Sequence, residues 1–573
     1  MPDTPQRRAG VVVPLFALRR HGDLGIGDTA ALRQAVDWAA HQGLSFIQLL
    51  PINATGSDCS PYNAISSSAL DVLSLDLSPQ ALPQVDPRYW RSLRRFLLPE
   101  ADAPGKAVNY PRVRRVKSLL LGHAFCRLDA AGHRALDQFI ETQGQWLQDY
   151  CLFRLLMQRH GHEDWTRWDP EVGSAEAARS WHQDHRHQPE VQREMRLHAY
   201  GQQVAMQQWH ALRQYAHSRS VSLMGDLPFG VSWCSADVFF NPQLFDLHWC
   251  GGAPPEPYFR DDAFVQRWGQ NWGIPLYNWQ AMARDNHAWW RQRVAKMTGI
   301  FDLIRIDHVL GFYRIYSFPW RPLHNAEFLP LSMQEAAARC EGRVPQFRDW
   351  DDDSPEHCAA NLAAGDARLR MILEAAGPAH IIAEDLGSVP HYVRPHLLSL
   401  NIPGFKICHW ENNGQGGVLL GENYPSCSFA TYATHDHEPM QQLWENRRAI
   451  LCHEAQADPD QVQQAARELQ FLCAFCGLAW PEDPAQLPPY DSKIRHHLIE
   501  ALMHSGSQYA AVLLSDLLGL NLRFNVPGIA QDQNWSARLP MTLTDLQRKP
   551  WQAEAGWLRS LLQKCGRAPE PAA

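Results

Sequence analysis

Four acidic residues stand where apolar stretches of this 573-residue chain end, and such positions suit chemistry on a sugar. They are Asp226 after 221–225, Asp307 after 303–306, Glu384 after 381–383 and Asp436 after 429–435. Arg305 lies two residues before Asp307, and a positive charge nearby favours the ionised form of a carboxyl group. A nucleophile that attacks a sugar carbon must be ionised. Asp307 is therefore the candidate nucleophile.

Glu384 suits the complementary role of proton donor. It follows apolar residues, and partial removal from water raises the pKa of a carboxyl group. The adjacent Asp385 would raise the pKa of Glu384 further. Retaining glycoside chemistry needs such a pair, one carboxyl ionised and one protonated, about 5–5.5 Å apart. Asp436, preceded by His435, could then hydrogen-bond the hydroxyls of the reacting sugar.

Each carboxylate taken alone is more often a helix cap or a partner in an ion pair. All four at matching strand ends instead favour an acid/base site.

The sequence predicts eight strands that position these side chains. The apolar runs 11–16 and 46–51 enclose a helix with an expected N-cap at Asp28 and an expected end at Gly43. Strand, helix and strand form a βαβ unit, which implies parallel pairing. The other expected strands are 221–226, 303–307, 381–385, 405–410, 429–436 and 511–517. The pattern predicts an α/β fold, a (β/α)8 TIM barrel, with its active site at the C-terminal ends of the strands.

A bare barrel needs about 250 residues, so the excess length predicts insertions. Residues 77–215 look largely helical, 241–290 are an irregular Pro/Gly/aromatic stretch, and 320–378 contain an acidic run that suits a solvated loop. We expect residues 1–545 to form one catalytic barrel with these inserted subdomains. Residues 546–573 should form a C-terminal helix and a frayed Pro/Ala-rich tail.

Composition excludes several classes of partner. A net charge of −8 argues against nucleic acid or an anionic membrane as the main partner. The 13 scattered cysteines suit a reducing compartment, and the lone pair Cys473 and Cys476 lacks the second ligand pair of a zinc site. Residues 1–8 lack the apolar core of a signal peptide, and no run is long enough to span a membrane. We therefore expect a cytoplasmic protein without a metal or other cofactor; nothing in the sequence indicates its oligomeric state.

Several short motifs together resemble one known family. They are Gly225–Pro228 with Ser235–Val238, Arg305–His308, Ala383–Gly387 and Thr434–Asp436, joined by Gly10–Leu18, Gly25–Asp28, Ser60–Tyr62, Val108–Tyr110 with Lys117, Gly252–Pro255, Pro275–Trp279 and Asn525–Gly528. The sequence resembles the 4-α-glucanotransferases of the amylomaltase (disproportionating-enzyme) family, in the α-amylase clan. The resemblance runs from about residue 10 to about residue 540. The stretches 269–273 and 306–314 look closer to the plant-type disproportionating isozyme.

The resemblance implies a role for each matching residue. Asp307 would be the nucleophile, Glu384 the general acid/base and Asp436 the stabiliser of the transition state. The residues expected to bind substrate are Arg305, His435, Asp226, Tyr62, Ser60, His308, Trp272 and Asn525, with Trp272 in a mobile loop of the 241–290 insertion. The partners would be maltooligosaccharides and α-1,4-glucans, and the chemistry would need no cofactor.

Two alternatives to a transferase stay open. A hydrolase of the same clan would use the same carboxylates and differ only in whether water or a sugar reaches the glycosyl-enzyme. A non-catalytic α-glucan-binding protein is the other, although a binder has no need of a paired acid and nucleophile. The aromatic stretch around Trp268, Trp272 and Trp279 weakly favours an acceptor site shielded from water.

Overall fold

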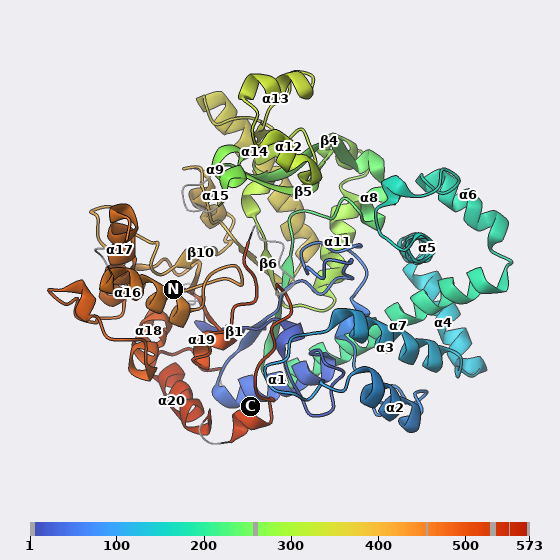
Figure 1. The fold of residues 1–573 in the computed structure, drawn as a ribbon, viewed down its shortest axis with the longest axis horizontal. Helices are drawn as coiled ribbons and strands as arrows, with labels where there is room; N and C mark the ends of the chain where they lie inside the picture. The colour runs from blue at the N-terminus through green and yellow to red at the C-terminus, as the bar shows by residue number, and fades with distance from the viewer. Residues whose placement is uncertain (1–5, 256–261, 454–456, 528–533, 549–550, 570–573) are drawn as a thin grey trace.

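Eight parallel strands close into a barrel at the centre of the molecule (Figure 1). The computed structural model describes residues 6–255, 262–453, 457–527, 534–548 and 551–569. The barrel strands are β1 (Arg8–Val12), β2 (Phe46–Gln48), β3 (Ser222–Leu227), β6 (Leu303–Ile306), β9 (His380–Ala383), β10 (Gly404–Ile407), β11 (Ser428–Thr431) and β12 (Tyr509–Leu513). Their order around the barrel is β1-β12-β11-β10-β9-β6-β3-β2. The predicted (β/α)8 barrel is confirmed.

Large side chains fill the barrel interior. Phe405 and Phe429 stack with their ring centroids 4.6 Å apart, and Phe46, Tyr509 and several aliphatic residues complete the cluster. A Cβ on Gly10 would lie 2.3 Å from the ring of Phe46, so only glycine fits at that position of β1. The interior is therefore a packed core, as in other barrels of this type.

Helices surround the barrel, and α1 shows how their ends are set. Its N-cap is Asp28, which accepts a hydrogen bond from the N–H of Ala31, and Gly43 ends it in the left-handed conformation, as the sequence predicts. The helices are α1 (Thr29–Gln42), α2 (Pro87–Leu97), α3 (Tyr110–Phe125), α4 (Ala130–Gln143), α5 (Gln145–His160), α6 (Ala175–His185), α7 (Pro189–Ser218), α8 (Ala236–Phe240), α9 (Ala263–Trp268), α10 (Trp279–Ala283), α11 (Ala288–Thr298), α12 (Asn325–Phe328), α13 (Met333–Arg339), α14 (Pro355–Ala376), α15 (Val393–Ser399), α16 (Met440–Cys452), α17 (Pro459–Phe475), α18 (Ser492–His504), α19 (Leu514–Leu517) and α20 (Trp551–Lys564).

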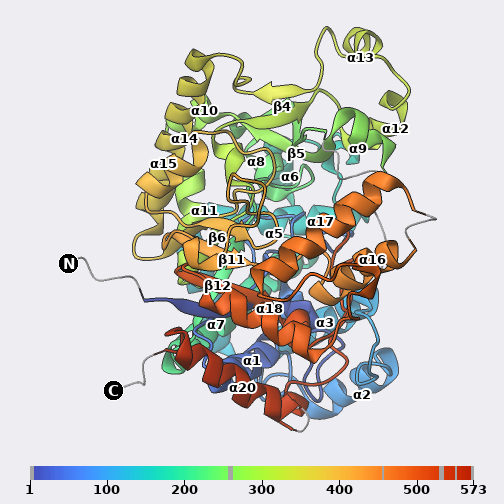
Figure 2. The same ribbon diagram turned by 90° about the vertical axis from the view of Figure 1, so that its left-hand side faces the viewer.

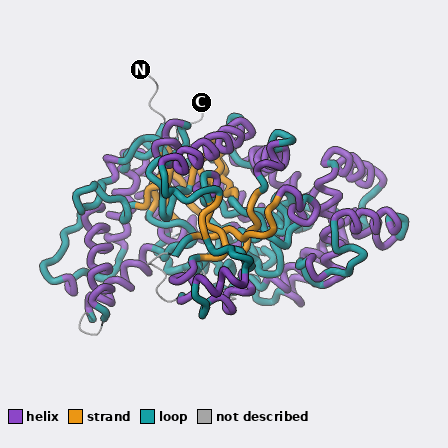
Figure 3. Tube along the Cα trace, turned by 90° about the horizontal axis from the view of Figure 1, so that it is seen from above, coloured by secondary structure: helices purple, strands orange, loops and turns teal. Residues whose placement is uncertain are grey.

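The first insertion joins β2 to β3 and is largely helical. It contains α2 to α7, which spread to the right and lower right in Figure 1. Seen from above in Figure 3, helices extend to both sides of the central strands. The 30-residue α7 packs against α1, α3, α4 and α5, so it ties the insertion to the barrel.

The sequence analysis missed a second sheet. β4 (Phe245–Ala253), β5 (Gln270–Tyr277), β7 (Ile315–Phe318) and β8 (Gln346–Arg348) form an antiparallel sheet in the order β5-β4-β7-β8, with β4 and β5 near the top of Figure 2. The stretch 241–290, expected to be irregular, therefore supplies two strands. Its Gly and Pro residues hide the strand pattern, and the register of β4 against β5 shifts twice.

Several expected element ends differ from the structure. β1 ends at Val12 and a 3-10 turn occupies Leu15–Ala17, whereas β12 ends at Leu513 and α19 follows. Apolar residues continue through both strand ends because the turns that follow are buried too. β11 ends at Thr431, so Asp436 lies in the loop after the strand and not at its end as expected. The C-terminal segment 546–573 contains α20, which packs beside α1 (Figure 2), while residues 549–550 and 570–573 lie outside the described residues. The division of the chain at residue 545 stays a prediction.

Two absences apply to the parts of the chain described here. None of these helices combines the length and hydropathy needed to cross a bilayer. No group of three or more His, Cys, Asp or Glu residues within the described residues is arranged to hold a metal ion.

Cys473 and Cys476 are both buried, and burial raises the pKa of each thiol, to about 12 and about 11.

Candidate active site

Arg305 lies at the centre of the candidate site and holds acidic side chains from neighbouring strands. It is 2% exposed on β6, and its Nη1 donates to both oxygens of Asp226 on β3, at 2.8 and 2.7 Å. Its Nη2 lies 2.8 Å from Asp307 Oδ1 and 4.0 Å from Glu384 Oε2. Because β3, β6 and β9 are adjacent in the barrel, three of the four expected carboxylates meet around one guanidinium.

Arg305 also rests on the apolar interior of the barrel. Its guanidinium carbon lies 5.7 Å from the centroid of the Phe405 ring. The charged cluster thus begins where the apolar interior ends. Burial acts to lower the pKa of Arg305, but Asp226 and Asp307 hold it well above its usual value, so the guanidinium stays charged.

Two backbone N–H groups orient Glu384. The N–H of His308 donates to Oε2 at 2.8 Å, and the N–H of Leu386 donates to Oε1 at 3.1 Å. His308 has a positive φ of 50°, a strained conformation for a residue with a side chain, and strain of this kind gathers at functional sites. Burial raises the pKa of Glu384 to about 7; Arg305 opposes this rise and Asp307 adds to it. The expected raised pKa of Glu384 is confirmed in direction and in cause.

Asp307 differs from its neighbours in having a carboxylate oxygen that accepts no hydrogen bond from the described residues. Its side chain is 26% exposed, whereas that of Glu384 is 11% exposed and that of Asp226 is fully buried. The ion pair with Arg305 is made by Oδ1, and no described residue donates a hydrogen bond to Oδ2. Asp307 therefore presents one unshielded carboxylate oxygen next to a residue that can donate a proton.

A second group, built on Tyr62 and His435, adjoins the first. The hydroxyl of Tyr62 donates to Asp226 Oδ2 at 2.7 Å, and its oxygen lies 3.2 Å from His435 Nδ1, with the two rings stacked 4.7 Å apart. His435 Nε2 lies 3.1 Å from Asp436 Oδ2. Both ring nitrogens of His435 thus face acceptors. Burial acts to lower the pKa of His435, but Asp436 raises it above the usual value, which favours the imidazolium.

Asp436 is held from two sides and is 40% exposed. Asn525 Nδ2 donates to its Oδ1 at 2.6 Å, and Arg523 Nη2 donates to its backbone oxygen at 3.2 Å. Burial acts to raise the pKa of Asp436, but His435 and Asn525 hold it well below its usual range. Asp436 is therefore ionised at neutral pH.

The other expected substrate-binding residues take different places. Ser60 Oγ accepts from the N–H of Tyr62 at 3.3 Å and so shapes the turn that carries Tyr62. Burial lowers the pKa of His308 to about 4, which keeps its imidazole neutral. The ring of His308 meets that of Trp272 edge to face, with the ring centroids 4.8 Å apart.

Trp272 is 39% exposed, but it lies on strand β5, so the prediction that it lies in a mobile loop is wrong. Gly528 of the Asn525 motif lies outside the described residues.

Trp535 is a site residue that the sequence analysis missed. Its ring centroid lies 5.7 Å from that of Tyr62 and 5.8 Å from that of His435, and it is 8% exposed. Its backbone oxygen accepts a hydrogen bond from the hydroxyl of Tyr110 at 2.5 Å. The one indication in the sequence was indirect, since Tyr110 belongs to a motif that carried the resemblance.

Comparison with known proteins finds relatives that match nearly the whole chain. The 4-alpha-glucanotransferase family matches residues 13–544 of the chain. A 4-alpha-glucanotransferase of Chlamydia pneumoniae is 28% identical over 553 residues, which cover 94% of this chain and 92% of the relative. The 4-alpha-glucanotransferase DPE2 of Oryza sativa subsp. japonica is 33% identical over 366 residues, 61% of this chain and 36% of the relative.

Solved structures show the same fold. The amylomaltase from Streptococcus agalactiae matches with a TM-score of 0.74 at 21% identity, covering 98% of this chain and 100% of that one. The amylomaltase from Corynebacterium glutamicum also matches with a TM-score of 0.74, at 20% identity, covering 96% of this chain and 75% of that one.

Proposed function

The chain belongs to the 4-alpha-glucanotransferases of glycoside hydrolase family 77 and is an enzyme of that activity, and on this premise we propose how its residues perform the reaction. The proposed substrates are maltooligosaccharides and other α-1,4-glucans. A glucan segment moves from a donor to the 4-hydroxyl of an acceptor through two displacements. Asp307 is the nucleophile, Glu384 the general acid/base and Asp436 the stabiliser of the transition state.

The observation that carries the proposal is the contrast between two carboxyls around Arg305 Nη2. Asp307 lies 2.8 Å from this nitrogen and has an unshielded oxygen, whereas Glu384 lies 4.0 Å away and burial raises its pKa to about 7. An open carboxylate oxygen beside a cation suits a nucleophile, and a buried carboxyl with a raised pKa suits a proton donor. A non-catalytic glucan-binding protein has no use for such a pair.

In the first half-reaction Asp307 attacks the anomeric carbon of the donor. A bond forms between an Asp307 carboxylate oxygen and C1, and the bond from C1 to the glycosidic oxygen breaks. That oxygen takes the proton of Glu384 and leaves as the free 4-hydroxyl of the departing chain. The new Glu384 carboxylate is stabilised by the N–H groups of His308 and Leu386 and by Arg305.

In the second half-reaction an acceptor completes the transfer. Glu384 removes the proton from the 4-hydroxyl of the acceptor, whose oxygen attacks C1 and breaks the ester to Asp307. Glu384 is thereby protonated again and Asp307 is again a carboxylate. A pKa of about 7 suits both tasks, because Glu384 can lose and regain its proton near neutral pH.

The remaining site residues bind and orient the sugar. Asp436 and His435 face the ring on which positive charge develops, and Asn525 holds Asp436. Asp226 and Tyr62, which are bonded to each other, hold Arg305 and His435 in place. Ser60, His308 and the exposed ring of Trp272 complete the proposed binding surface, with Trp272 stacking on a glucose unit.

Incubation with maltotriose tests the function, with the products separated by chromatography. Transfer produces glucose and a ladder of longer oligomers. Short products alone would mean that water takes the place of the acceptor, as in a hydrolase. An unchanged substrate would mean binding without catalysis, and either of these two results would overturn the proposal.

A further inference from the structure

Asp516 is a buried carboxylate that the proposed chemistry does not use. It lies in α19, just after barrel strand β12, and is 2% exposed. Its Oδ2 is buried, and no described residue hydrogen-bonds to it. Burying a carboxylate is costly unless the charge is compensated, so an acid at this position calls for a reason.

Among the described residues, the side chain of Asp516 accepts one hydrogen bond, at the start of another helix. Its Oδ1 accepts from the N–H of Met440 at 2.8 Å, and Met440 is the first residue of α16. The N-cap residue of α16 is Pro439, which makes no side-chain capping bond. The first N–H groups of a helix lack partners within it and carry partial positive charge, which a carboxylate satisfies. Asp516 thus caps α16 from a neighbouring element.

This cap lies at one end of the loop that carries Asp436. The loop runs from the end of β11 at Thr431 to the start of α16, and Asp436 lies four residues before Met440. The segment after α19 holds the same loop again, through Arg523 at the backbone oxygen of Asp436 and Asn525 at its Oδ1. Residues 516–525 therefore hold the loop at Asp436 and at the helix behind it.

We propose that Asp516 is a positioning residue for Asp436: by capping α16 it keeps the loop 434–439 in the position from which Asp436 meets the sugar. The inference rests on the proposed role of Asp436. Met440 is buried, so water does not replace the lost bond when Asp516 is changed. Without the cap the first turn of α16 is free to fray, and the loop with Asp436 loses its fixed end. A small displacement of a group that acts in the transition state lowers turnover more than it weakens binding.

The test compares two substitutions of Asp516 in the full chain. Asp516→Asn keeps an acceptor for the Met440 N–H; burial raises the pKa of Asp516 to about 7, so a neutral amide is a close substitute. Asp516→Leu keeps the size and removes the acceptor. With maltotriose as substrate, we expect the Leu variant to lose about 10- to 100-fold in kcat with KM changed less than about threefold. The Asn variant should keep at least about half of the wild-type kcat. Equal kcat for the Leu variant and the wild type would overturn the inference, as would equal losses for Leu and Asn.

A matched control separates positioning from loss of stability. Asp491 caps α18, accepting from the N–H groups of Lys493 and Ile494 at 2.9 Å, and α18 packs against α19. Asp491→Leu should lower the melting temperature and leave kcat unchanged when both are measured well below that temperature. If kcat falls with the melting temperature in the same proportion for Asp491→Leu and Asp516→Leu, the role of Asp516 is structural only.

A second pair of variants removes the donor and does not depend on folding of the Leu variant. Met440→Pro deletes the N–H at the first helical position, where proline is well tolerated, and Met440→Ala keeps the N–H with a similar loss of packing. A fall in kcat for Pro beyond that for Ala supports the inference, and equal values contradict it. Asp436→Asn is measured alongside. If that variant keeps its activity, the assignment of Asp436 is wrong; if it loses activity while the Asp516 and Met440 variants do not, only the positioning role is wrong.

Discussion

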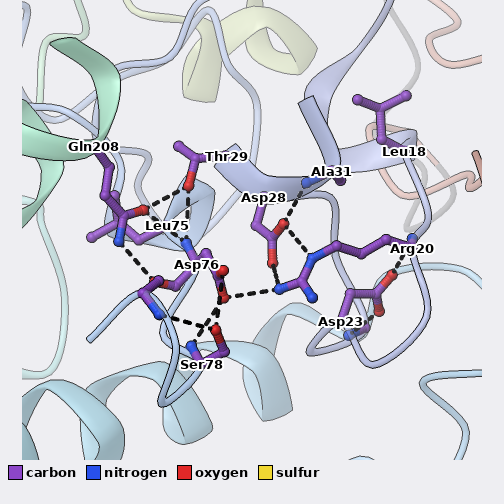
Figure 4. A network of polar contacts seen from close by, with 12 residues as sticks. Leu18, Arg20, Asp23, Asp28, Thr29, Ala31, Leu75, Asp76, Ser78 and Gln208 are labelled. Atoms are coloured by element: carbon purple, nitrogen blue, oxygen red, sulfur yellow. Dashed lines mark hydrogen bonds and ion pairs between the residues drawn. The ribbon is translucent and has the colours of Figure 1, made fainter. Parts of the chain in front are cut away.

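Two clusters in this protein combine an arginine with aspartates, but only one of them leaves a carboxylate oxygen without a hydrogen-bond donor among the described residues. In the Arg20 cluster (Arg20, Asp23, Asp28, Asp76 and Ser78; Figure 4), Arg20 donates to both oxygens of Asp28 and to Asp76 Oδ1. Every carboxylate oxygen in this cluster accepts at least one hydrogen bond, from Arg20, Arg538, Ser78 or backbone N–H groups. In the Arg305 cluster (Arg305, Asp226, Asp307 and Glu384), Asp307 Oδ2 has no donor among the described residues.

The two clusters differ in how many carboxylate oxygens accept hydrogen bonds and in how far the side chains are exposed to solvent. Asp28 is 1% exposed and its oxygens are fully engaged, whereas Asp307 is 26% exposed with one oxygen open. The Arg20 cluster joins the loop after β1 to residue 76 of the first insertion, and Arg538 adds the C-terminal part of the chain. A saturated carboxylate stabilises structure, and an unsaturated one beside a cation is available to react. The comparison predicts that substitutions in the two clusters have opposite effects on activity and stability.

The largest effect is expected for Asp307→Asn. The amide is isosteric, so packing is kept, but it is a far poorer nucleophile than the carboxylate. We expect the rate of maltotriose disproportionation to fall by roughly 10⁴- to 10⁶-fold. The melting temperature, measured by calorimetry, should change by no more than about 2 °C. Retention of more than a few per cent of wild-type activity would remove Asp307 from the role of nucleophile.

Glu384→Gln should block both half-reactions with a glucan donor. An α-glucosyl fluoride needs no acid to leave, so the variant should still form the glycosyl-enzyme and accumulate it, since no base remains. Mass spectrometry should find the sugar on the peptide that contains Asp307, and azide, which needs no deprotonation, should restore turnover. Unaided turnover of the fluoride at the wild-type rate would point to another acid/base, with Asp436 tested first.

The pH dependence of kcat/KM for the wild-type enzyme tests the assignment of Glu384 as the general acid/base. The acid form of Glu384 is needed for a glucan donor, and burial raises its pKa to about 7, so the active form persists up to that pH and is lost above it. We expect kcat/KM for maltotriose to fall as pH rises through about 7. Formation of the glycosyl-enzyme from the fluoride should lack this fall, and an equal fall with both donors would contradict the role of Glu384.

Asp28→Ala tests the Arg20 cluster and should lower the free energy of unfolding. It removes the bidentate bond to Arg20 and the N-cap of α1, and loss of one partner of a buried pair costs about 3–5 kcal/mol. Chemical denaturation should show this loss, while kcat well below the melting temperature changes less than about twofold. The control is Asp86→Ala, which removes an N-cap from α2 without an ion pair and should cost about 1 kcal/mol. A large fall in kcat for Asp28→Ala would end the distinction between the clusters.

The smallest effect is expected for Trp272→Ala at the edge of the site. An exposed ring that stacks on a glucose unit should raise KM by about three- to tenfold, consistent with roughly 1 kcal/mol of lost contact. The melting temperature should change little because the ring is 39% exposed. The matched control is Trp268→Ala, four residues earlier and 2% exposed, which should cost about 3–5 kcal/mol of stability. A large stability loss with unchanged KM for Trp272→Ala would make it a core residue.

The barrel and the carboxylates of the candidate site could be predicted because both are local patterns. An apolar run of three to seven residues followed by Asp or Glu is visible in the sequence at 226, 307, 384 and 436, and parallel strands bring such ends to one face. The raised pKa of Glu384 followed from its apolar neighbours and Asp385 for the same reason. The sheet of β4, β5, β7 and β8 escaped prediction because its strands contain Gly and Pro and pair across long separations.

The sequence by itself determined which acidic residues lie after the barrel strands, because each of them follows an apolar run that forms a buried strand. Only the tertiary structure decided how these side chains are shared: that Arg305 bonds to Asp226 79 residues earlier, and that Tyr62 reaches His435 373 residues later. It also decided that Asp516 caps the helix behind Asp436. Charge, hydrogen bonding and removal from water act through space, so the state of each carboxylate depends on neighbours that only the closed barrel brings together.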